Sequence, residues 1–144
     1  MKITPTMKTT PMRSRAVVLI LAMVIATWGG AAAAGDIYVI CSAGVALKPD
    51  EVRNVFLGEQ GFAGSIKLFP ADNSAAQVDF LEKVLKLDPN KYAGIWTKKS
   101  FRDGTNPPPV KGSDAEAIAY VKQTAGACTY VSSAPAGVAV VAKF

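Results

Sequence analysis

The chain has 144 residues, of which 16 are basic, 11 are acidic and none is histidine. The lack of histidine removes the commonest general base and the commonest metal ligand. Carboxylates are scattered and there is no nucleophile–histidine pair, so we expect a protein that is not an enzyme, with no catalytic residue, no metal site and no cofactor.

The N-terminal segment has the three parts of a secretory signal peptide. The first fifteen residues carry four basic side chains and no acidic one, residues 16–28 form an apolar run, and residues 31–34 are all alanine. The apolar run is shorter than the roughly 20 residues that span a bilayer. We therefore predict a signal peptide over residues 1–35, cleaved near Ala34 or Gly35. The alternative is an anchor that stays attached.

Cleavage changes the charge balance and predicts the compartment. Removal of four of the 16 basic residues leaves 12 against 11 acidic ones, so the high isoelectric point belongs mainly to the signal and we expect no nucleic-acid partner. Removal of 35 of the 144 residues leaves 109, enough for one domain over residues 36–144. We expect this domain in the periplasm, with membrane contact only through the signal peptide during export.

Strands and helices alternate along residues 36–144. Hydrophobic patterning and turn residues predict strands at 36–41, 65–69, 127–131 and 138–141. They predict helices from Pro49 to Leu57, after the turn at 70–74, from Asp88-Pro89 onward, and from Ser113 to about Thr124. The apolar face of the second helix is expected to be Val78, Leu81, Val84 and Leu85, while Tyr92, Trp96 and Phe101 are expected to pack. The pattern indicates an α/β fold with a mixed sheet flanked by helices.

The two cysteines, Cys41 and Cys128, lie at the ends of two predicted strands. An even number of cysteines in an exported protein favours a disulfide, which would form if the two strands are antiparallel neighbours. The alternative is a pair of buried thiols, because the sequence does not give the distance between them.

A candidate binding site lies where the strand before Pro70 gives way to a helix. Asp72, Asn73 and Ser74 are there, with the backbone N–H of Ala75 beside them. Free N–H groups at a helix start, joined by a hydroxyl donor, can hold a small oxyanion. The helix start at Ser113 repeats the pattern. In both places the alternative is that the polar side chain only caps its helix.

The order of these segments resembles that of the phosphate-binding proteins of ABC transporters. The segments that carry the resemblance are Pro49–Gly58 (PDEVRNVFLG), Gly64–Phe69, Asp72-Asn-Ser74, Phe80-Leu81, Lys111–Val121 and Gly126–Val131. The resemblance implies a type 2 periplasmic-binding-protein-like fold, of which this chain has the second lobe alone. It also implies that Asp72 and Ser74 are anion ligands. The family pattern Arg-x-Asp-Gly-Ser-Gly-Thr has lost its arginine to Pro70 and its threonine to Ala76.

Two functions follow as hypotheses. The first is a solute-binding-like domain that binds a small oxyanion such as phosphate, or assists its uptake or sensing. The second is an interaction module that kept the lobe and lost the ligand. A single lobe exposes the face that normally meets the other lobe, so a homo-dimer or a periplasmic partner protein would cover it.

Processing of the N-terminus is directly testable. N-terminal sequencing of the protein recovered from the periplasm should begin between Ala32 and Ile37, because the small-residue segment ends there. Recovery of a chain with Met1 intact, and only from the membrane fraction, would contradict the prediction.

Overall fold

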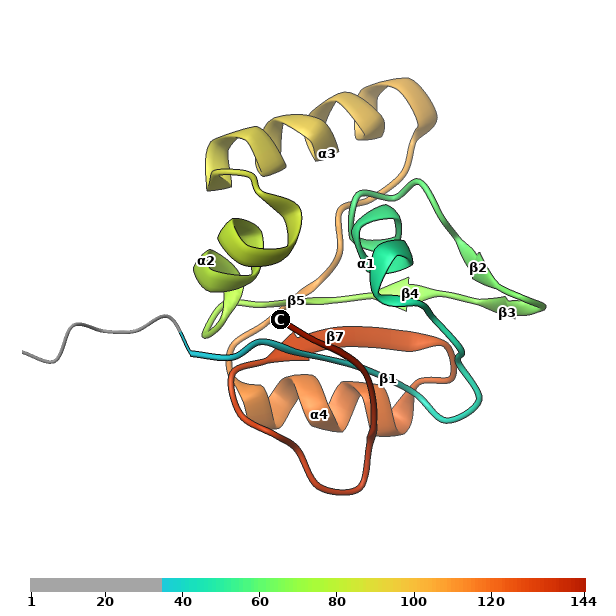
Figure 1. Cartoon of the computed structure of the whole chain (residues 1–144). Helices are drawn as coiled ribbons and strands as arrows, with labels where there is room; N and C mark the ends of the chain where they lie inside the picture. The colour runs from blue at the N-terminus through green and yellow to red at the C-terminus, as the bar shows by residue number, and fades with distance from the viewer. Residues whose placement is uncertain (1–34) are drawn as a thin grey trace, which may run out of the picture. The chain divides into compact units, whose positions relative to one another are not determined.

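The computed structural model describes residues 35–144, which belong to one compact unit (Figure 1). The predicted signal peptide lies outside these residues, apart from Gly35, and stays a prediction. Within the described part of the chain, no helix is long and apolar enough to cross a bilayer.

A four-stranded mixed sheet lies at the centre, in the order β4-β7-β1-β8. The strand β1 (Tyr38–Cys41) pairs antiparallel with β7 (Ala127–Val131) on one side and with β8 (Ala139–Lys143) on the other. The short strand β4 (Phe69–Pro70) joins β7 in parallel. The mixed sheet and its helices confirm the predicted α/β class.

The single strand predicted at 65–69 is wrong, because it is divided between two sheets. Ile66–Lys67 (β3) forms a hairpin with Phe62–Ala63 (β2), whereas Phe69–Pro70 is β4 of the main sheet. The backbone N–H of Leu68 turns to the carbonyl of Gly61, and that of Phe69 to the carbonyl of Gly126. A Cβ at Gly126 would come within 1.9 Å of the Lys67 carbonyl oxygen, so this crossing requires glycine.

Three helices begin close to the predicted residues. They are α1 (Pro49–Phe56), α3 (Pro89–Asp103) and α4 (Asp114–Gln123). Asp88 caps α3 by accepting the Lys91 N–H, and Ser113 caps α4 by accepting the Glu116 N–H. The capping interpretation of Ser113 is therefore confirmed.

The second helix differs from its prediction. It has one α-helical turn, α2 (Gln77–Phe80), which runs into a π-helical turn, η1 (Leu81–Leu85). Its N-cap is Ala76, without a side-chain cap, so neither Asn73 nor Ser74 caps it. Of the predicted apolar face, Leu81 and Leu85 are buried and Val84 packs against the core, but Val78 is 64% exposed and Phe80 is buried in its place.

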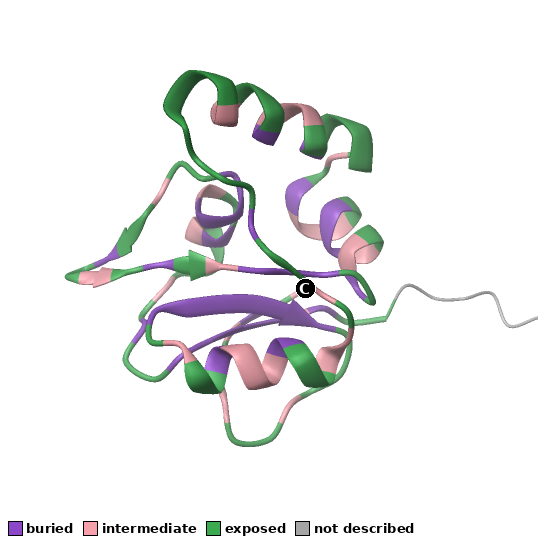
Figure 2. Ribbon diagram, turned by 180° about the vertical axis from the view of Figure 1, so that it is seen from behind, coloured by how far each residue is buried: buried purple, intermediate pink, exposed green. Residues whose placement is uncertain are grey.

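Helices cover both faces of the sheet (Figures 1 and 2). On one face, α4 packs on β7, and the buried side chains there include Ile40, Val121 and Val131. The larger core lies on the other face, beneath α1, α2 and α3. At its centre the ring of Phe80 stacks on Tyr130, with centroids 3.8 Å apart, and Phe56 packs edge-on against Phe80.

The Cys41–Cys128 disulfide joins the two central strands. The two cysteines face each other directly in the antiparallel register of β1 and β7, and neither side chain is exposed. The condition stated for the bridge is therefore met, and a disulfide is compatible with an oxidising environment outside the cytoplasm.

Removal of the bridge should lower stability strongly. The bridge closes a loop of 87 residues, and restriction of the unfolded chain by a loop of this length is worth about 4 kcal/mol. We expect the Cys41→Ser/Cys128→Ser double variant to lose about that much free energy of unfolding in urea titrations. Detection of two free thiols in the denatured, unreduced wild-type protein would show that no bridge forms.

Candidate functional site

The structure brings the predicted anion ligands together at one end of the sheet. β5 (Asp72–Asn73) pairs in parallel with β6 (Val110–Lys111), and the start of α4 lies beside them. The consecutive residues Asp72, Asn73 and Ser74 lie at β5 and just after it, and Ser113 lies on the connection from β6 to α4.

Their polar atoms, however, are engaged with other parts of the chain. The side-chain amide of Asn73 donates to the Asp114 carboxylate at 2.6 Å and to the Tyr130 carbonyl at 3.0 Å, and its oxygen accepts the Ala75 N–H. The hydroxyl and the backbone N–H of Ser74 both donate to the Lys111 carbonyl, at 3.2 and 2.9 Å. The donors named for an oxyanion at this place are therefore used in internal hydrogen bonds.

Acidic side chains surround the same place. Asp114 and Glu116 lie in the first turn of α4, where they offset the positive end of the helix dipole. Asp114 also accepts the N–H and the hydroxyl of Ser132, at 3.1 and 2.7 Å. These two carboxylates place negative charge of the chain itself at the helix start, which disfavours an oxyanion there.

Asp72 has a different environment from its neighbours. Its side chain is 3% exposed, and one carboxylate oxygen, Oδ1, accepts the hydroxyls of Tyr92 at 3.1 Å and Tyr130 at 3.0 Å. The other oxygen, Oδ2, accepts the Tyr92 hydroxyl at 3.0 Å. Burial raises the pKa of Asp72 from 3.8 to about 6, and the two tyrosine hydroxyls only partly offset this. The same burial, together with the Asp72 charge, raises the pKa of both tyrosines.

Backbone hydrogen bonds hold Asp72 in this buried place. The N–H of Ala71 donates to the Cys128 carbonyl, and the N–H of Asp72 donates to the Pro109 carbonyl, each at 2.8 Å. Tyr130 comes from β7 and Tyr92 from the first turn of α3. The carboxylate is therefore enclosed by three elements distant in sequence.

Asp72 lies at the edge of a hollow of about 520 Å³ between α3 and residues 107–110, which we call the α3 groove. Figure 1 shows the chain that leads to this segment, in light orange, running back from the end of α3 toward β5. The wall residues are mainly apolar: Leu81, Pro89, Tyr92, Ala93, Trp96, Phe101, Pro107, Pro108 and Val110. A concave, largely apolar hollow with a few polar groups has the composition of a small-ligand site.

Trp96 lies between two hollows. It lines the α3 groove and also a second hollow of about 470 Å³, which pairs it with Phe69 and the prolines 107–109. Its indole N–H is buried and makes no hydrogen bond of good geometry. Among the described residues it is the buried side-chain polar atom without a hydrogen-bond partner.

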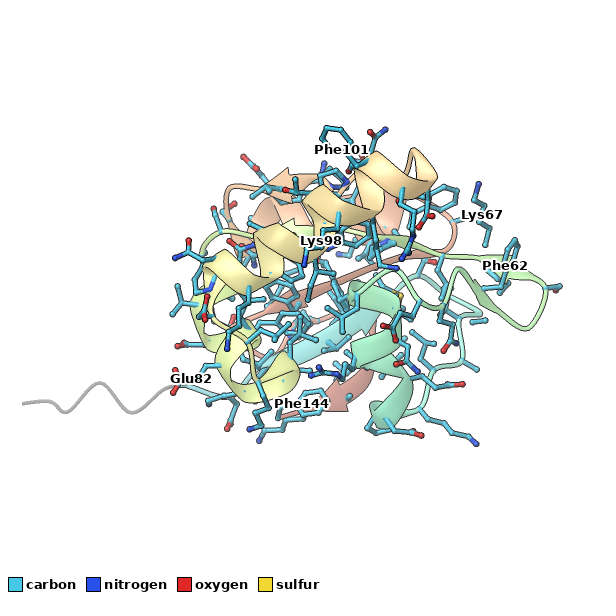
Figure 3. The ribbon with its side chains drawn as sticks, turned by 90° about the horizontal axis from the view of Figure 1, so that it is seen from above. Phe62, Lys67, Glu82, Lys98, Phe101 and Phe144 are labelled. Carbon is cyan, nitrogen blue, oxygen red and sulfur yellow. A yellow bond between two sulfur atoms is a disulfide. The ribbon has the colours of Figure 1, made fainter. Side chains whose placement is uncertain are left out.

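The sequence prediction for the aromatic residues of α3 was correct for two of three. Tyr92 and Trp96 are buried, but Phe101 is 92% exposed. It lies in the last turn of α3, where Figure 3 shows its side chain projecting from the helix. The roles of Tyr92 and Tyr130 as donors to Asp72 were missed, because their pairing with β5 depends on long-range contacts.

Comparison with known proteins provides no assignment: no protein-family model matches the chain, and no curated protein is a match. Within residues 35–144, no three histidine, cysteine, aspartate or glutamate side chains gather as a metal site would require. The functional argument therefore depends on the chain's own geometry.

The buried carboxylate predicts a pH dependence of stability. Because the pKa of Asp72 is raised in the folded protein, the folded state binds the proton more tightly, and stability falls as pH rises from about 4 to about 6. The full difference is about 3 kcal/mol. In the Asp72→Asn variant, the free energy of unfolding measured over the same pH range should no longer show this decrease. An unchanged difference between wild type and variant at pH 4 and pH 7 would contradict the assignment.

Proposed function

We propose that residues 36–144 form a non-catalytic solute-binding module of the periplasm, and that the α3 groove is its binding site. The observation that carries the proposal is a hollow of about 520 Å³ with apolar walls and a buried carboxylate at its edge. Its volume is in the range of small-ligand sites, about 300–1,000 Å³.

Exposed apolar side chains at the rim of the α3 groove also support its assignment as the binding site. Phe101 is 92% exposed and Val110 is 60% exposed, and both line the groove. Large apolar side chains that meet at a hollow are typical of a recognition surface. The disulfide supports the proposed compartment, since it suits an oxidising environment.

The resemblance to phosphate-binding proteins supports the wider class of function. It favours a single lobe of a type 2 binding-protein fold, and the mixed α/β architecture is consistent with such a lobe. Within this class, the engaged donors of Asn73 and Ser74 favour the groove over the predicted oxyanion position.

An interaction module remains the second candidate. Phe62 and Phe69, at 57% and 41% exposed, lie on β2 and β4, and Val140, 46% exposed, lies on β8. A homo-dimer or a periplasmic partner protein would bury such side chains.

Occupation of the groove can be followed through Trp96. It is the single tryptophan of residues 36–144, because the other of the two, Trp28, belongs to the predicted signal. We expect the exported protein to bind the neutral probe 2-phenylethanol with a dissociation constant on the order of 1–10 mM, measured as a change in tryptophan fluorescence.

A matched pair of variants makes this test specific. Ala93 is exposed and lines the groove, whereas Lys98 is exposed on the same helix and lines neither the groove nor the second hollow. Ala93→Phe should abolish binding of the probe by filling the mouth, and Lys98→Phe should leave it unchanged. Absence of binding, or equal effects of the two variants, would overturn the groove as the site.

Titration of the same protein with phosphate and sulfate separates the oxyanion hypothesis from the groove. Because the local donors are engaged, we expect no calorimetric binding tighter than about 1 mM. Tighter binding that is lost in Ser74→Ala, or gained in Pro70→Arg, would favour the oxyanion hypothesis instead.

A further inference from the structure

The Asp72 carboxylate has acceptor capacity that the chain leaves unused. An ionised carboxylate offers about four lone-pair positions. Oδ1 receives two tyrosine hydroxyls and Oδ2 receives one, the Tyr92 hydroxyl being shared between them. At neutral pH the carboxylate is mainly ionised, because its pKa is about 6. An additional donor arriving from the groove can therefore bind to it.

No cation of the described chain balances this charge. The pKa of Asp72 is set by burial and by the hydroxyls of Tyr130 and Tyr92, with no lysine or arginine among its causes. Two basic residues near the end of α3 have other partners: Lys99 donates to the Gly58 carbonyl, and Arg102 pairs with Asp103. A buried charge without a counter-ion is costly, and a cationic ligand would relieve that cost.

The apolar walls of the groove indicate what kind of molecule would bear the cationic group. Leu81, Pro89 and Trp96 present apolar or aromatic surface in the same hollow as Asp72. An apolar stem would replace water along these walls, and the tryptophan ring adds favourable electrostatics for a cation. An anion would meet the Asp72 charge and is disfavoured.

We propose that the α3 groove binds a small molecule with a protonated primary amine on an apolar stem, and that Asp72 is the counter-ion of the amine. An ammonium group supplies three donors and one charge, which match the free positions and the charge of the carboxylate. This proposal rests on the groove as the binding site and specifies the chemical class of its ligand. A hollow of about 520 Å³ favours a small molecule over a protein segment.

The test compares two probes of nearly the same shape. 2-Phenylethylamine and 2-phenylethanol differ in the group that would reach Asp72, and both are titrated into the exported protein at pH 7.5 with tryptophan fluorescence as the readout. A charge-assisted hydrogen bond should make the amine bind at least about tenfold more tightly than the alcohol. An amine that binds no more tightly than the alcohol would overturn the proposal while leaving the groove as a site.

Variants assign the preference to one carboxylate. In Asp72→Asn, which keeps the side-chain shape and removes the charge, the amine should bind only as well as the alcohol. The control is Asp50→Asn, an exposed aspartate on α1 outside the groove, which should keep the preference. Preference retained in Asp72→Asn would overturn the role of Asp72.

Two further measurements test the chemical class of the ligand. Below pH 6 the amine should lose affinity by about tenfold per pH unit as Asp72 becomes protonated, because Tyr92 and Tyr130 stay neutral there and the amine stays charged. The alcohol should show no such loss. Tighter binding of 3-phenylpropionate, or of a lysine-containing peptide, than of 2-phenylethylamine would overturn the assignment to a small amine.

Discussion

The antiparallel register between β1 and β7 determines which side chains reach each face of the sheet. Cys41 and Cys128 are directly opposite in this register, and their disulfide prevents a slip of the two strands. A slip by one residue would turn every side chain of β7 to the other face. With the register held, Cys128 and Tyr130 face the larger core, and Ala127 and Val131 face α4.

Tyr130 links that register to the proposed binding site. Its ring stacks on Phe80 in the core, and its hydroxyl donates to Asp72 at the edge of the α3 groove. Tyr92 makes the second link, because it belongs to α3, which forms the opposite wall. The core, the sheet and the groove therefore share one hydrogen-bonded cluster. Burial of a carboxylate in this cluster lowers stability at neutral pH, and such costs are concentrated where proteins bind ligands.

The two predicted helix starts have similar local sequences, but their polar side chains make different hydrogen bonds in the folded chain. Asn73, Ser74 and Ser113 are residues that a helix start or an oxyanion can use equally well. In the folded chain, Ser113 caps α4, while Asn73 joins β5 to α4 and β7 through Asp114 and Tyr130. The side-chain amide of Asn73 thus holds the two-stranded sheet of β5 and β6 against α4 and β7. The local sequence supplies these polar groups, but the hydrogen-bond partners that each group binds are determined by the residues that the fold brings near it.

What the sequence by itself determined was local. Propensity and patterning within a few residues account for the caps at Asp88 and Ser113, the positions of α1, α3 and α4, and the buried strands β1 and β7.

Tertiary structure alone decided the division of residues 65–69 between two sheets, because Gly126 approaches Lys67 closely at the point where the two sheets meet. It also decided the exposure of Val78, because the elements packed beneath the short helix α2 determine which of its side chains meets the core, and Phe80 does so in place of Val78. The burial of Asp72 belongs to the same group, because its environment comes from Tyr92 and Tyr130, 20 and 58 residues away, and no local pattern records such contacts.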